Sequence, residues 1–157
     1  MIFLTTGTQL PFDRLVRFVD DWAGSHPSVE IFAQIGPGKY KPRNFNSVDY
    51  LDQSSYRECF ERAQGLVSHA GMGTILTTLM AGKPVVIMPR RADLGEHRND
   101  HQVATCRKLV NLKGCYIAWE GNELCRMLTY FSDLKSEEID PYASHDLLAA
   151  IRQYIEG

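Results

Sequence analysis

A glycine-rich turn near the middle of the chain carries residue types that can bind phosphate. It reads His69-Ala70-Gly71-Met72-Gly73-Thr74 and follows a short apolar run. Glycine lets the backbone approach a ligand closely and adopt a positive φ. The free N–H groups and the positive dipole end of a following helix favour a diphosphate. The pattern predicts a nucleotide or sugar-nucleotide site, and the alternative is a tight strand-to-helix turn that binds nothing.

The side chains of this turn have more specific candidate roles. His69 is the first candidate catalytic residue, because an imidazole can donate to a phosphate, orient an acceptor or act as a base. The alternative for His69 is a histidine satisfied by backbone at the end of a strand. Thr74 can cap the helix or donate its hydroxyl to a phosphate. Met72 belongs to the candidate binding turn, although packing is the commoner role of methionine.

The densest run of hydrogen-bonding groups is the later stretch GEHRNDHQ. Its Glu96 can accept from a ribose or sugar hydroxyl and is the second candidate catalytic residue. His101 and Gln102 begin a predicted helix and are candidates to bind a sugar or a diphosphate. The alternative is a solvated loop in which Asn99 or Asp100 caps that helix.

Two further segments add polar groups. Arg90, in the pair Arg90-Arg91, can bind a phosphate, or the pair is simply solvated. Gly7, Thr8 and Gln9 follow the amino-terminal apolar run, and they either contact a nucleotide or serve only the turn. Because the carboxyl ends of parallel strands meet at one sheet edge, we expect all these segments to converge there.

The elements that must position these residues alternate along the chain. The expected strands lie at residues 2–6, 28–35, 48–51, 66–68, 84–88 and 115–119. The expected helices lie at 11–19, 54–63 with Ser54 and Ser55 as caps, 75–81, 100–112, 123–131 and 146–155. This alternation favours an α/β fold with a Rossmann-like, doubly wound parallel sheet. Residues 1–157 are expected to form a single domain.

Composition excludes several classes of protein. The net charge of −2 disfavours a nucleic-acid binder. The four cysteines are scattered without a CxxC pair, and neither HExxH nor the GxxxxGK[ST] pattern occurs, so no metal site or NTPase is predicted. Free thiols and an amino terminus without a basic, long apolar leader favour a cytoplasmic protein.

Four blocks in consistent order resemble a known family. They are Thr6-Gly7-Thr8-Gln9 with Phe12-Asp13-Arg14-Leu15, Ser68 to Thr74, Gly82-Lys83-Pro84, and Pro89-Arg90-Arg91 with Gly95 to Gln102. Through these blocks the chain resembles the small catalytic subunits of two-part glycosyltransferases of family 28. That group includes bacterial exopolysaccharide and capsule enzymes and the cytosolic subunit of the dolichol-pathway N-acetylglucosaminyltransferase. The last block is more similar to the bacterial polysaccharide branch.

The resemblance implies a fold and a set of binding residues. The chain would be the carboxy-terminal, donor-binding half of a GT-B enzyme. Gly7, Thr8 and Gln9 would form the first donor loop, and residues 69–74 would line the diphosphate. The match also assigns donor contacts to Asn99, His101 and Gln102. Several relatives hold the ribose with a glutamate three residues after the motif's threonine or serine, and here that position is Thr77, which leaves Glu96 as a substitute.

The resemblance also implies an activity and partners. The expected function is that of an inverting UDP-sugar-dependent glycosyltransferase subunit acting on a lipid-linked glycan in exopolysaccharide or capsule assembly. UDP-sugar would be its donor substrate, with no further cofactor. One domain cannot form a two-domain cleft, so a membrane-anchored partner subunit would supply the other half and keep this chain at the inner face of the membrane. The alternatives are a non-catalytic regulatory or scaffolding subunit and an unrelated nucleotide-binding α/β protein.

Overall fold

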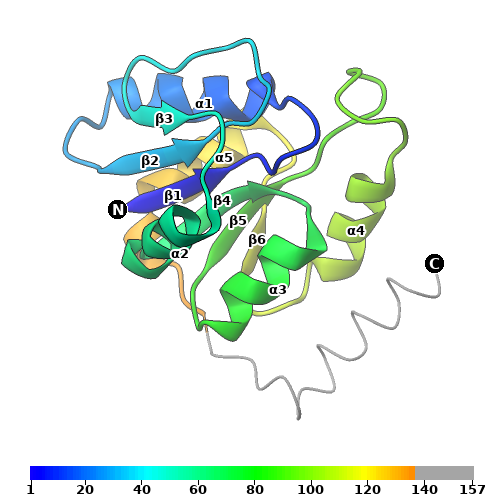
Figure 1. The fold of residues 1–157 in the computed structure, drawn as a ribbon. Coiled ribbons are helices and arrows are strands. Elements are labelled where there is room, and N and C mark those ends of the chain that lie inside the picture. Colours follow the sequence, from blue (N-terminus) through cyan, green and yellow to red (C-terminus); the bar gives the residue numbers. More distant parts are fainter. Residues whose placement is uncertain (137–157) are drawn as a thin grey trace.

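The computed structural model describes residues 1–136 and is built on one six-stranded sheet, whose place in the fold can be followed in Figure 1. All neighbouring strands are parallel, in the order β3-β2-β1-β4-β5-β6. The strands are β1 Ile2–Thr5, β2 Ile31–Gln34, β3 Asn46–Val48, β4 Gly65–His69, β5 Val85–Met88 and β6 Cys115–Ile117. The predicted fold class, a doubly wound parallel α/β sheet, is confirmed.

Helices cover both faces of the sheet (Figure 1). They are α1 Asp13–Gly24, α2 Gln53–Arg62, α3 Met72–Met80, α4 His101–Leu109 and α5 Gly121–Thr129, followed by the short 3₁₀ helix Phe131–Asp133. One buried core joins α1 and α5 to the sheet, and the other joins α2, α3 and α4 to the opposite face. The central strands β1, β4 and β5 consist of apolar runs because both of their faces are buried.

The strand order reverses between β1 and β4. After β1 the chain crosses through α1 to β2 on one side, whereas after β4 it crosses through α3 to β5 on the other. Because α1 and α3 lie on opposite faces, the two connections leave the sheet in opposite directions. Ligands of open α/β sheets bind in the crevice outside the carboxyl ends of strands at such a point.

Several predicted boundaries move. The strand expected at 48–51 lies two residues earlier, at Asn46–Val48, and it pairs with β2 at the sheet edge. The helix expected at 75–81 begins three residues earlier, because Gly71 occupies the N-cap position. Thr74 therefore lies inside α3 and does not cap it. The closing helix expected at 146–155 lies outside the described residues.

The ends of α2 are held by side chains that were not expected there. Asp52, rather than Ser54 or Ser55, caps the amino terminus by accepting from the Ser55 N–H at 2.9 Å. At the other end, the Lys83 ammonium donates to the carbonyls of three residues, at 2.6 to 2.8 Å: Phe60, Glu61 and Ala63. Lys83 thus binds α2 to the start of β5 and has a structural role in the Gly82-Lys83-Pro84 block.

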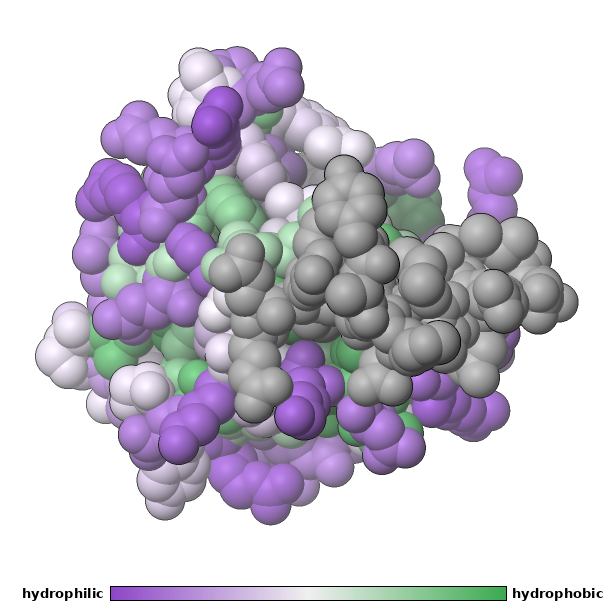
Figure 2. Space-filling view, turned by 90° about the horizontal axis from the view of Figure 1, so that it is seen from below, coloured by the Kyte–Doolittle hydropathy of each residue, from purple (hydrophilic) through white to green (hydrophobic). Residues whose placement is uncertain are grey.

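The surface mixes polar and apolar side chains. Figure 2 views the molecule from below and shows hydrophilic residues of the described part around the rim, with smaller hydrophobic groups between them. The large exposed apolar side chains come from different elements: Val29, Tyr50, Met80, Leu94, Val110 and Tyr130. None of the helices in residues 1–136 has the length and apolar character that a membrane span requires.

Candidate functional site

A hollow of about 410 Å³ opens at the switch point between β1 and β4. It is formed by the ends of β1, β2 and β4, the loops that follow β1 and β5, and the starts of α3 and α4. We call it the central hollow. Its lining residues are Thr5, Thr6, Gly7, Thr8, Gln9, Leu10, Gln34, Tyr56, His69, Gly71, Gly73, Thr74, Arg90, His97 and Gln102. Each of the segments that were expected to converge contributes at least one residue to this hollow.

The His69 imidazole fills a slot between two glycines. A Cβ added at Gly71 would lie 2.4 Å from His69 Nε2, and one added at Gly7 would lie 2.7 Å from Cε1. Gly7 also has a φ of +76°, which side-chain-bearing residues rarely adopt. Both glycines therefore leave room for the histidine ring, a reason for their presence that the sequence pattern did not indicate.

His69 is uncharged at neutral pH. Burial, helped by the nearby Arg90 and His97, lowers the pKa of its imidazole to about 4, although a hydrogen bond to the Thr5 carbonyl opposes this shift. The ring is fixed by that bond and by the two glycines. It therefore lies at the end of β4 as an oriented, neutral hydrogen-bonding group facing the central hollow.

Gly73 has different surroundings from Gly71. A Cβ at Gly73 would meet no heavy atom within 4 Å. The glycine lies in the first turn of α3, where the N-cap residue Gly71 provides no side-chain cap. The backbone N–H groups in the first turn of α3 are therefore uncapped and lie next to open space, an arrangement that favours binding of an anion. Beside this turn, the Tyr56 hydroxyl hydrogen-bonds with the side chains of Thr74 and Thr5.

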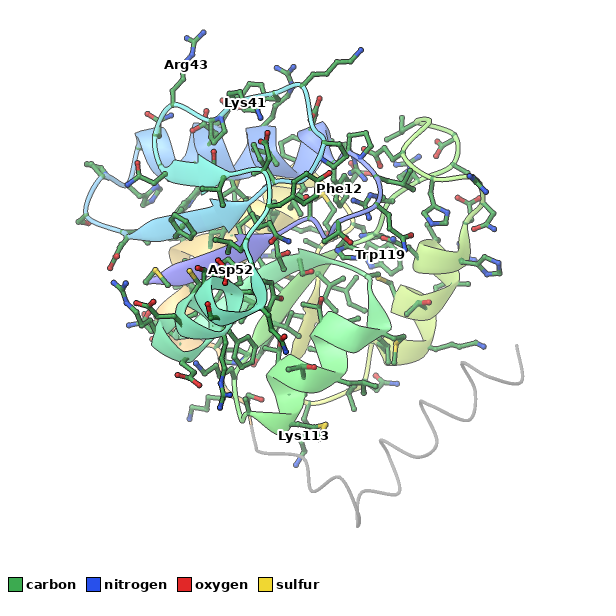
Figure 3. All side chains as sticks on the ribbon, viewed as in Figure 1. Phe12, Lys41, Arg43, Asp52, Lys113 and Trp119 are labelled. Atoms are coloured by element: carbon green, nitrogen blue, oxygen red, sulfur yellow. The ribbon has the colours of Figure 1, made fainter. Side chains whose placement is uncertain are left out.

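Arg90 lies inside the site and is only 3% exposed. Its Nη2 donates to the carbonyls of Thr6 at 2.7 Å and Leu10 at 2.6 Å, and its guanidinium carbon lies 4.9 Å from the centre of the Phe12 ring. Figure 3 labels Phe12 at the amino-terminal end of α1. The sequence suggested that Arg90 binds a phosphate or is solvated. In the structure its guanidinium instead fixes the loop that carries Gly7, Thr8 and Gln9.

Gln102 joins the other two segments. Its Oε1 accepts from the Arg90 N–H at 3.0 Å and from the Ala70 N–H at 3.2 Å. One amide from the first turn of α4 therefore connects the end of β5 to the glycine-rich turn after β4. Burial of Gln102 (8% exposed) makes the connection difficult to replace by water.

Glu96 is bound to protein groups. Its carboxylate takes a bidentate pair of hydrogen bonds from Arg14, at 2.7 and 2.9 Å, and a third from the Arg91 N–H at 3.0 Å. Arg14 also donates to the Pro89 carbonyl. Glu96 is not among the residues that line the central hollow. Its catalytic role stays a prediction. The contacts of Glu96 in the structure hold the β5–α4 loop against α1.

The remaining predicted residues lie beside the central hollow. Met72 and His101 line a neighbouring hollow of about 440 Å³, which shares Gly71, His97 and Gln102 with the central one. Asn99 accepts the His101 N–H with its side-chain oxygen at 3.2 Å and so acts at the start of α4. Thr77, at the position of the family's ribose-binding glutamate, is exposed on α3 and outside the central hollow.

Several lining residues were missed by sequence reasoning: Thr5, Thr6, Leu10, Gln34, Tyr56 and His97. The positions of Thr5, Thr6 and Gln34 at the carboxyl ends of β1 and β2 were a usable signal, since these ends meet the switch point. Tyr56 carried no such signal, because only the packing of α2 brings it to the site. Within residues 1–136, no three His, Cys, Asp or Glu side chains gather as metal ligands do.

The family model for the glycosyltransferase family 28 carboxy-terminal domain matches residues 1–134. The chain belongs to this family. The predicted family is thereby confirmed, and the chain is a glycosyltransferase domain. The bacterial exopolysaccharide branch is a finer assignment that this match does not test.

Two curated relatives are similar to the chain. The human protein "UDP-N-acetylglucosamine transferase subunit ALG13" is 29% identical over 167 residues, covering 99% of this chain and 14% of the relative. The mouse protein of the same name is 31% identical over 106 residues, covering 61% of this chain and 9% of the relative. The chain thus spans only a small part of the length of these relatives.

Solved structures share the fold. A solution structure of ALG13 has a TM-score of 0.64 at 19% identity and covers 99% of this chain and 94% of that one. The glycosyltransferase of kitacinnamycin has a TM-score of 0.60 at 20% identity, and the calicheamicin glycosyltransferase CalG4 has 0.57 at 14%. The last two are covered over 39% and 41% of their chains. The chain therefore matches under half of each of these two glycosyltransferases.

Proposed function

We propose that this chain is the donor-binding, catalytic subunit of an inverting UDP-sugar-dependent glycosyltransferase. It would transfer a hexose to a lipid-linked glycan in exopolysaccharide or capsule assembly. A membrane-anchored partner would supply the acceptor side and hold the chain at the cytoplasmic face of the membrane. The observation that carries the proposal is the central hollow, where the uncapped start of α3 faces open space beside His69, in a family 28 domain.

The donor diphosphate would lie at the start of α3. Uncapped N–H groups and the helix dipole favour negative charge there. The departing UDP carries the charge that develops during transfer, so fixed donors at this place lower the barrier. Gly73 allows the close approach, whereas a side chain at this position would occupy the space of the phosphates.

His69 would orient the bound groups. An imidazole with a pKa of about 4 is neutral at pH 7 and removes a proton only weakly. We therefore assign the proton-accepting role to the partner subunit and hydrogen bonding to His69. Holding donor and acceptor in a reactive geometry is itself a large contribution to catalysis.

The names of the curated relatives and the hollow at the strand ends support a partner subunit. The chain covers 39% and 41% of two glycosyltransferases of the same fold, and its curated relatives are described as subunits. The central hollow opens at the carboxyl edge of a single sheet. A second domain facing it would close the site and exclude water from the reaction.

The test is reconstitution of transfer from a radiolabelled UDP-sugar to membrane lipid. The chain alone should bind UDP without transferring sugar, and the chain with its partner should transfer it. His69→Gln in the complex should lower kcat by about tenfold, the loss expected for an orienting hydrogen bond. Full transfer by the partner without this chain would contradict the proposal and favour a regulatory subunit.

A further inference from the structure

His97 lines the central hollow, but the proposed chemistry gives it no role. It lies in the loop between β5 and α4, and it lines both the central and the neighbouring hollow. His69 lines the same central hollow from the end of β4. The two histidines thus reach the hollow from different elements, the β5–α4 loop and β4.

The His97 ring presents a hydrogen-bond donor. Its Nδ1 accepts from the Asn99 N–H at 3.4 Å. A ring nitrogen that accepts carries no proton, so in the neutral ring the proton lies on Nε2. Nε2–H can thus donate to an anionic or hydroxyl oxygen in the hollow.

An ion pair anchors the loop that carries His97. Arg14 on α1 binds the adjacent Glu96 at 2.7 and 2.9 Å, across 82 positions of the sequence. The two side chains are only 17% and 12% exposed, and the Pro89 carbonyl and Arg91 N–H complete the cluster. We call this cluster the loop anchor. Such bidentate, largely desolvated pairs fix direction as well as distance.

We propose that His97 is a further ligand-contacting residue of the central hollow, a donor to the diphosphate of the bound nucleotide, and that the loop anchor positions it. This inference rests on the proposed function, since it takes a nucleoside diphosphate as the ligand. Glu96 then acts as a positioning residue and has no contact with the ligand.

The first test is calorimetric titration of the full chain with UDP. His97→Ala should weaken UDP binding by about tenfold, the loss expected for one hydrogen bond to a charged group. Arg98→Ala is the matched control, because Arg98 is the exposed next residue and lines neither hollow. It should leave the affinity within twofold.

The second test distinguishes positioning from general stability. Glu96→Gln should weaken UDP binding in the wild-type background and change it less than twofold in the His97→Ala background, since coupled residues are non-additive. Lys41→Met, which breaks the exposed Lys41–Asp49 pair on the outer loop seen in Figure 3, should change UDP binding in neither background. Equal losses from Glu96→Gln in both backgrounds would show that Glu96 does not act through His97.

The outcomes separate the inference from the proposed function. Unchanged UDP affinity of His97→Ala, with wild-type binding intact, would overturn the inference alone. Absence of UDP binding by the wild-type chain, alone and with its partner, would overturn the proposed function together with it. His97 lies on a surface loop, so this comparison stands even where a variant of the loop anchor does not fold.

Discussion

Gly71 and Gly73 are two positions apart and have different roles. Gly71, with Gly7, leaves space for the His69 ring, whereas Gly73 faces open space at the start of α3. The glycine-rich turn therefore makes room for the His69 ring at one glycine and leaves space for a ligand at the other. The two functions can be separated by substitution.

Gly71→Ala and Gly73→Asp should fail in different ways. The Cβ at Gly71 would lie 2.4 Å from His69 Nε2, so Gly71→Ala should lower the free energy of unfolding by about 1–3 kcal/mol. Gly73→Asp should leave that free energy within about 1 kcal/mol and abolish UDP binding. Urea denaturation and calorimetry measure the two quantities. UDP affinity that is unchanged in Gly73→Asp would remove the diphosphate from this turn.

His69 predicts a pH dependence of stability. Its folded-state pKa of about 4 lies below the ordinary value of 6.5, so between these pH values only the unfolded chain binds the proton. The stabilisation from the neutral ring is complete above pH 6.5 and is lost as the pH falls towards 4. The loss reaches about 3 kcal/mol once the pH is below both pKa values.

The comparison that checks this is denaturation of wild type and His69→Gln at pH 7 and pH 5. The free energy of unfolding should fall more steeply with acid in the wild type than in the variant. Parallel falls would show that His69 titrates normally in the folded chain. NMR titration of the His69 ring protons measures the same pKa directly.

Sequence reasoning found nine of the lining residues, those in Gly7 to Gln9, the glycine-rich turn, Arg90 and Gln102. They were predictable because strand ends and glycines are visible in the sequence. The partners of Arg90 and Glu96 were not visible, since Thr6 and Arg14 are about 80 positions away. Both residues look like free ligand-binding groups until the fold brings these partners to them.

At the scale of elements, the edge strand β3 shows what periodicity cannot reveal. The central strands are apolar runs and were predicted closely. Asn46–Val48 is a short, partly exposed strand without an apolar run, and it is a strand because it pairs with β2. The start of α3 was misplaced for a related reason, since the glycine at its cap was interpreted as part of a turn.

Lys83 offers a prediction at this scale. Lys83→Met would remove the ammonium from three carbonyls at the carboxyl end of α2 and should lower the free energy of unfolding by about 2 kcal/mol. UDP binding should not change, because Lys83 does not line the central hollow.

The matched control is Arg57→Met in the same helix. Arg57 pairs with Glu61 at the surface, with both side chains more than 60% exposed, so its loss should change stability by less than about 0.5 kcal/mol. Equal effects of the two substitutions would show that the Lys83 contacts do not stabilise α2.

At the scale of the whole molecule, the sheet order places the site. Reversal between β1 and β4 brings three connecting segments around one hollow, and Arg90 and Gln102 join them through buried hydrogen bonds. The fold class followed from the alternation of strands and helices, and the family from four ordered motifs. The single domain over 1–157 stays a prediction, as do the acceptor and the partner.

The most direct test of the proposed function is calorimetry of the purified chain with UDP and with ADP. Binding of one UDP per chain, tighter than ADP and lost in Gly73→Asp, is the predicted result. Preference for ADP, or no nucleotide binding even with the partner present, would contradict the proposed donor site.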